Sequence, residues 1–113
     1  MEPEPLSWAE FERVEMRVGT IVAAELFAEA RRPAFKLRLD FGDHGIRKSS
    51  AQITDRYRPE ELIGRQVVAV TNFPPKQIAT LMSECLVLGA VGERQVVTLL
   101  APDANVPNGT RIG

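Results

Sequence analysis

Residues 34–41 read Ala-Phe-Lys-Leu-Arg-Leu-Asp-Phe, and from the first phenylalanine onward apolar and charged side chains alternate. Successive side chains of a β-strand point to opposite faces, so this alternation predicts a strand with one buried face. The buried face consists of the apolar side chains Phe35, Leu37, Leu39 and Phe41. The opposite face consists of the charged side chains Lys36, Arg38 and Asp40. The next residues, 42–45, read Gly-Asp-His-Gly and predict a turn into a third strand over 46–53, which makes a hairpin.

Two elements are predicted before this hairpin. Residues 16–26 are rich in Val, Ile, Thr and Ala and predict the first strand, in which Gly19 suggests a bulge or sharp bend. Ser7 and Glu10 have the spacing of a capping box, which predicts a short helix. A helix of about two turns is marginal alone and needs an apolar surface, either its own barrel or a second subunit. The face that needs covering carries Trp8, Phe11 and Val14.

A short helix and further strands are predicted after the hairpin. Pro59 fits the first turn of a helix that Gly64 ends, and the chain must leave the ladder at the prolines of residues 73–75. The tail, residues 101–113, reads as loops. The expected strands cover residues 66–71, 84–91 and 95–100. Five to six strands with one helix after the third fit an OB-fold, a small Greek-key β-barrel, better than a sandwich, so we predict an all-β barrel with short flanking helices.

Composition describes one small domain with an uneven charge. The chain has 113 residues, 44% of them apolar, and a formal net charge of −1. Residues 1–30 hold seven acidic and two basic residues, whereas residues 31–58 hold eight basic and three acidic ones.

One cysteine excludes an intrachain disulfide, and no apolar run approaches the roughly 20 residues that span a membrane. The sequence opens without a signal-peptide pattern, so we expect no membrane insertion and a cytoplasmic location.

The residues that carry chemistry are scarce. His44 is the single histidine and lies in a predicted turn, while Cys85 lies in an apolar strand that predicts a buried structural thiol. Metal sites need clustered Cys, His or carboxylate ligands, and no phosphate-cradling glycine loop is found. We therefore predict no catalytic residue, no metal site, no cofactor and no enzymatic activity.

The remaining signals concern binding. Four cations project from neighbouring predicted strands and could contact phosphates from one barrel face, or could form an ordinary solvated face. These are Lys36, Arg38, Arg47 and Lys48. The connection over residues 72–78 exposes Phe73 among prolines and a lysine. Phe73 either packs inward or lines a groove or a subunit contact.

Several runs resemble a known family. Residues 11–22, Phe-Glu-Arg-Val-Glu-Met-Arg-Val-Gly-Thr-Ile-Val, resemble the opening of the tRNA-binding OB domain, which is appended to some methionyl-tRNA synthetases and also forms free dimeric proteins. Four later runs resemble the CsaA proteins, a bacterial secretion-related chaperone family. They cover residues 47–53, 64–70, 72–79 and 82–84. The resemblance covers residues 9–113 as one domain, after a loose N-terminal segment and helix start over residues 1–8.

The resemblance implies a homodimeric OB-fold in which the N-terminal helix, with Trp8, Phe11 and Val14, helps form the dimer. It implies a chaperone that binds unfolded preproteins or peptides and works with export machinery. The alternative is a protein that recognises the outer corner of tRNA. The implied RNA-binding residues are Arg17, Lys36, Lys48, Asn72, Lys76, Met82 and Ser83. The implied peptide-binding residues are Phe35, Phe73, Pro74, Pro75 and Met82.

Overall fold

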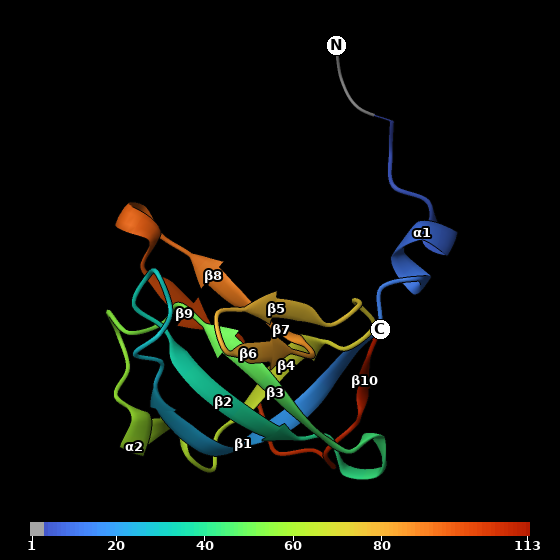
Figure 1. Ribbon diagram of the computed structural model, residues 1–113. Helices are drawn as coiled ribbons and strands as arrows, with labels where there is room; N and C mark the ends of the chain where they lie inside the picture. Colours follow the sequence, from blue (N-terminus) through green and yellow to red (C-terminus); the bar gives the residue numbers. More distant parts are fainter. Residues whose placement is uncertain (1–3) are drawn as a thin grey trace.

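The computed structural model describes residues 4–113 and contains one strongly curved antiparallel sheet (Figure 1). Five of its strands follow one another in the order β3-β2-β1-β4-β7, and β10 pairs with the beginning of β1. Their bounds are β1 (Met16–Leu26), β2 (Phe35–Asp40), β3 (Ile46–Ala51), β4 (Gln66–Val70), β7 (Leu86–Val87) and β10 (Arg111–Ile112). The predicted strands over residues 16–26 and 34–41 and the turn at 42–45 are confirmed.

The alternation in β2 determines which side of the sheet faces the core. Phe35, Leu37 and Leu39 are buried, while the charged side chains between them lie on the outer face. Ile21 of β1, Val67 of β4 and Leu62 complete the same core cluster. Because the apolar faces of β1 to β4 all point inward, the sheet curls around one core as a barrel does.

β1 is long enough to pair with two strands, β4 and β2, and it is irregular between the two pairings. Its first half pairs with β4 and its second half with β2, with a register shift between Ile21 and Ala23. The bulge therefore lies at Val22, so the prediction of a bulge at Gly19 was wrong, and the alternative of a sharp bend there stays a prediction. Gly19 has another role, since a Cβ atom there would lie 2.6 Å from Cε1 of Phe41. The phenylalanine ring packs directly on this backbone, which leaves no space for a side chain.

The barrel is nearly closed where β3 approaches the chain before β7. The backbone N–H of Glu84 donates to the Lys48 carbonyl at 2.8 Å, and the Lys48 N–H donates to Glu84 Oε1 at 3.0 Å. These contacts connect the first and last strands of the sheet order, which gives the OB-fold-like barrel that the sequence predicts.

Two small hairpins add to the barrel. β5 (Lys76–Ile78) pairs with β6 (Leu81–Ser83), and β8 (Gly89–Val91) pairs with β9 (Val97–Leu99) around the 3-10 turn η2 (Glu93–Gln95). The strand predicted over 84–91 is divided because the chain changes partner at Leu88. Its N–H donates to the Val68 carbonyl, and its own carbonyl accepts from Leu100.

The helices are short and lie outside the barrel. In α1 (Trp8–Glu12) the predicted capping box is present, with the Ser7 hydroxyl accepting from the Glu10 N–H at 3.1 Å. Hydrogen bonds from Ser7 lower the pKa of Glu10.

The second helix, α2 (Pro59–Leu62), begins at the predicted proline, and Gly64 follows it with a φ of +91°. The 3-10 turn η1 (Gly42–His44) occupies the predicted hairpin turn. Within residues 4–113 we find no helix with the length and apolarity needed to cross a membrane.

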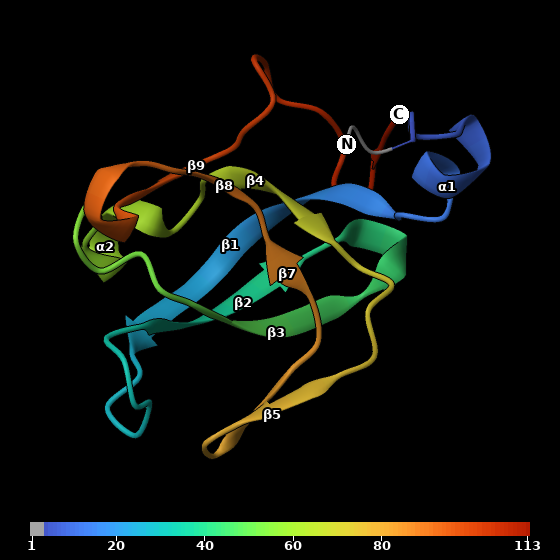
Figure 2. The ribbon, with the colours of Figure 1, turned by 90° about the horizontal axis from the view of Figure 1, so that it is seen from above.

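The tail differs from the predicted loops because polar contacts hold it against the barrel. Gln66 bonds both the carbonyl and the N–H of Val106, and the Gly109 N–H donates to the Val18 carbonyl at 2.7 Å. The tail then forms β10 beside β1. Arg111 donates to the Glu12 carbonyl at 2.8 Å, so α1 lies next to the C-terminal end (Figure 2).

Candidate ligand-binding surfaces

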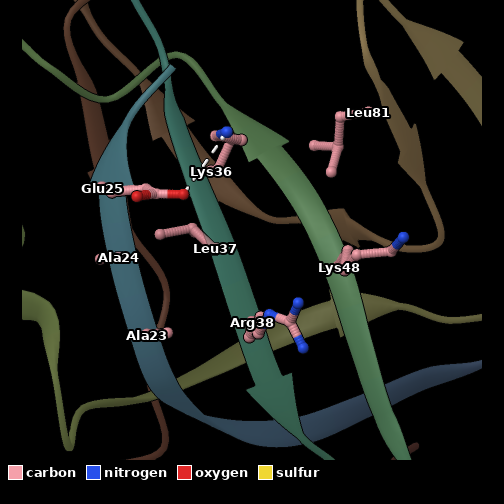
Figure 3. A pocket seen from close by; sticks show the side chains of 8 residues that line it. All are labelled: Ala23, Ala24, Glu25, Lys36, Leu37, Arg38, Lys48 and Leu81. Carbon is pink, nitrogen blue, oxygen red and sulfur yellow. Dashed lines mark ion pairs between the residues drawn. The ribbon is translucent and has the colours of Figure 1, made fainter.

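Cations from two strands gather in a hollow on the outer face of β1, β2 and β3 (Figure 3). We call it the basic hollow; its volume is about 410 Å³, and it is lined among others by Glu25, Lys36, Arg38, Lys48 and Leu81. The β2–β3 register sets Lys48 directly opposite Arg38. Side chains of paired residues stand on the same face, so the two positive charges are neighbours.

The cations of the basic hollow differ in whether they form ion pairs within the protein. Lys36 Nζ lies 3.4 Å from Glu25 Oε1 and 5.4 Å from the centre of the Phe27 ring. Arg38 and Lys48 form no ion pair with any residue in the described range 4–113. These two are therefore the cations that an anionic ligand would contact first.

Arg47 does not belong to this face, which corrects the sequence-based grouping of four cations. It is paired with Leu39 in the β2–β3 register, and its guanidinium donates to the Thr71 carbonyl. Adjacent residues of a strand point to opposite faces, so Arg47 and Lys48 cannot both face outward from the same strand.

A second hollow, of about 310 Å³, lies beside the β5–β6 hairpin. We call it the apolar hollow; it is lined by Ser50, Phe73, Pro74, Lys76, Ile78, Ser83, Cys85 and Leu86. Phe73 and Leu86 are 57% and 48% exposed. Two large apolar side chains left in water at the rim of one hollow mark a surface suited to apolar ligand groups.

The structure brings only part of the predicted peptide-binding set together. Phe73 and Pro74 line the apolar hollow, whereas Pro75 and Met82 are exposed nearby and line none of the hollows described. Phe35 is only 4% exposed and belongs to the barrel core. It is on the buried face of β2, so its assignment as a peptide contact is corrected.

The predicted RNA-binding residues lie in different places. Lys36 and Lys48 line the basic hollow, and Lys76 and Ser83 line the apolar hollow. Met82 is exposed on β6 without lining either. The remaining two, Arg17 and Asn72, lie where α1 joins β1.

Arg17 and Asn72 are engaged in holding that junction. The Asn72 amide accepts from the Glu15 N–H at 3.0 Å and donates to the Arg13 carbonyl at 2.6 Å. The Arg17 guanidinium lies 2.7 Å from the Glu15 carboxylate, which lowers the pKa of Glu15, and it also donates to the Gly109 carbonyl. Both side chains have structural partners.

The residues predicted for a dimer contact are near one another. Trp8 is 82% exposed, and Val14 is exposed as well. Phe11 and Val14 line a shallow hollow with Ile112 and Gly113. A second copy covering this surface stays a prediction, based on the cost of leaving a tryptophan in water.

Sequence reasoning missed Leu86, Ile78 and Ser50 as lining residues. Leu86 lies within a run that reads as a buried strand, and the other two have no distinguishing local pattern. The packing of β6 and β7 against β3 brings them together. No signal in the sequence identified them.

Cys85 is the thiol that borders the apolar hollow. Burial raises its pKa to about 11, so almost none of it is thiolate near neutral pH. We expect the folded protein at pH 8 to react with a disulfide reagent such as DTNB about 100-fold more slowly than a small free thiol, because the thiolate is the nucleophile. The same protein unfolded in guanidinium should react at the ordinary rate. Equal rates in the two states would contradict this burial.

Comparison with known proteins places this geometry in a family. Residues 16–111 match the family model described as "Putative tRNA binding domain". The chaperone CsaA of Bacillus anthracis is 52% identical, with a TM-score of 0.93, over 97% of this chain and 100% of that one. The CsaA chaperone of Picrophilus torridus is 46% identical, with a TM-score of 0.89, over 96% and 100%.

Curated relatives extend the match to much longer proteins. Methionine–tRNA ligase 1 of Sorangium cellulosum is 39% identical over 91% of this chain but only 14% of its own length. The chain likewise spans only 16% of the length of the first methionine–tRNA ligases it matches. Together, the family model and these relatives show that the chain belongs to the tRNA-binding domain family, with CsaA chaperones as its structural neighbours.

Proposed function

We propose that this protein is a non-catalytic chaperone that binds unfolded polypeptide segments as a homodimer. The observation that carries the proposal is the apolar hollow, which leaves Phe73 and Leu86 exposed at its rim. Covering apolar surface yields roughly 25 cal/mol per Å², so a client side chain entering the hollow gains affinity in proportion to the area it covers. The high identity to CsaA chaperones supports the same activity.

A homodimer would serve this activity in two ways. A second copy covers the exposed surface of α1, which carries Trp8. It also places two apolar hollows on one rigid body, and two linked sites raise the avidity for a long unfolded chain. Unfolded preproteins awaiting export in the cytoplasm are the clients that the resemblance to CsaA implies.

The test compares two leucines of similar exposure. Leu86→Ser removes apolar surface from the hollow, whereas Leu100→Ser removes it from a residue that is 43% exposed and lines none of the hollows described. We expect wild-type protein, added at one dimer per client molecule, to slow the aggregation of a denatured client. Light scattering without nucleotide measures this aggregation. The Leu86→Ser variant should need several-fold more protein for the same effect, and Leu100→Ser should match the wild type. Aggregation unchanged by wild-type protein would remove the proposal.

RNA binding is the second candidate, and the basic hollow favours it. Arg38 and Lys48 are adjacent, outward-facing and free of ion pairs within residues 4–113. Such side chains can neutralise phosphates, and the affinity should then fall steeply with salt. The family model that matches residues 16–111 supports this reading.

A further inference from the structure

Another hollow adjoins the apolar one and differs from it in charge. It has a volume of about 810 Å³ and lies between the loop of residues 27–34 and the β5–β6 hairpin. We call it the arginine hollow, because the loop contributes Arg31 and Arg32 to its lining. It shares three lining residues with the apolar hollow: Ser50, Lys76 and Ile78. The two hollows are therefore contiguous along β5.

The arginine hollow concentrates positive charge without compensation. Arg31, Arg32 and Lys76 are all exposed, and none is in an ion pair within the described range. Glu29 of the same loop does not line the hollow, and its carboxylate accepts from the Thr80 hydroxyl at 3.4 Å. Like charges facing one hollow repel one another, so an anionic group placed among them is favoured.

The strand β5, which contributes to both hollows, has an edge that is not used for pairing. β5 pairs only with β6 among residues 4–113, so its second edge has no strand partner. The backbone of an extended peptide can add to such an edge by main-chain hydrogen bonds. Nucleic acid has no equivalent backbone pairing, so this feature favours a polypeptide as the occupant.

We propose that the two hollows form one composite site for extended polypeptide segments that carry an apolar side chain close to carboxylates. The apolar side chain enters the apolar hollow, and the carboxylates contact Arg31, Arg32 and Lys76. Lys76 and Ile78 of β5 line both hollows, and a strand advances about 3.3 Å per residue, so the apolar side chain and the carboxylates of a client should lie within about three residues of each other. This inference rests on the proposed polypeptide binding and adds the class of sequence that is preferred.

The test uses labelled synthetic peptides and fluorescence anisotropy. Each peptide has a Gly/Ser backbone, one Leu-Phe pair, and two glutamates placed three residues after or before the pair, with matched peptides carrying Gln or Lys in their place. Of the two glutamate peptides, with the glutamates before or after the Leu-Phe pair, one should bind more tightly. We expect that peptide to bind about tenfold more tightly than the lysine peptide of the same order at low salt. The difference should shrink to about twofold or less at roughly 0.5 M salt, because exposed charges are screened there.

Charge reversal in the protein provides the matched control. The Arg31→Glu/Arg32→Glu variant should invert the preference, and Arg31→Gln/Arg32→Gln should reduce it to the part that Lys76 supplies. An Arg56→Glu/Arg94→Glu control, with the same change in net charge at exposed residues outside the hollow, should keep the wild-type preference.

The outcomes separate this inference from the function on which it rests. Equal binding of glutamate and lysine peptides, with both weakened by Leu86→Ser, would overturn the composite site and leave polypeptide binding intact. No binding of any peptide would overturn both. A loss of tRNA binding in Arg31→Glu/Arg32→Glu with unchanged peptide preference would assign the arginine hollow to RNA and also overturn the inference.

Discussion

The Phe41→Ala variant is expected to lose about 3–5 kcal/mol of its free energy of unfolding. The Phe41 side chain is fully buried, and its ring packs against the backbone of Gly19 where β1 crosses the barrel. Truncation removes apolar contacts and leaves a cavity that the surrounding strands cannot readily fill. Domains of this size have roughly 5–15 kcal/mol in total, so the loss approaches the limit of folding.

Urea unfolding followed by fluorescence measures the effect at one fixed protein concentration, because self-association would add to the apparent stability. Phe73→Ala is the control, since it removes the same side chain from the exposed rim of the apolar hollow. Its loss should stay below about 1 kcal/mol, as for most surface changes. Similar losses in both variants would contradict the placement of Phe41 in the core.

The Arg38→Glu/Lys48→Glu variant is expected to lose at least about a hundredfold in affinity for tRNA at low salt, if RNA is a ligand of the basic hollow. Each lost phosphate contact also removes nearly one unit from the slope of log affinity against log salt, so the slope should fall by about two. Filter binding or anisotropy over a salt series measures both quantities.

The control for this prediction is again Arg56→Glu/Arg94→Glu, which changes net charge equally and leaves the basic hollow intact. Its affinity should remain within a few-fold of the wild type. Equal losses in the two double variants would mean that the RNA responds to overall charge alone. Absence of tRNA binding by the wild-type protein at low salt would eliminate RNA as a ligand.

The parts of the fold that the sequence predicted are those with strong local patterns. The alternation from Phe35 to Phe41 determines both the strand and its buried face, and the Ser7–Glu10 spacing determines the cap of α1. β5, β6 and β10 were missed because strands of two or three residues contain too few alternations to detect. Their pairing depends on partners elsewhere in the chain.

The candidate sites were predicted less completely for the same reason. Lys36 and Lys48 were grouped correctly because their strands form one hairpin. Arg31 and Arg32 received no role, since only the approach of their loop to the β5–β6 hairpin gives them a shared hollow with Lys76. The family resemblance assigned Phe35 to a peptide ligand, although the alternation over residues 35–41 already placed it on the buried face. For this residue the alternation predicted the position better than the resemblance did.

The contacts between the tail and β1 also bear on how the barrel forms. Arg17 reaches the Gly109 carbonyl across 92 residues, and Thr20 reaches Asn108 across 88. Bringing such distant segments together costs entropy before any contact compensates for it, so chains with this topology fold on the slower millisecond-to-second scale. Until the tail arrives, the beginning of β1 lacks its β10 partner, and α1 lacks the bond from Arg111. The same C-terminal residues thus pair with the beginning of β1 and hold α1 in place.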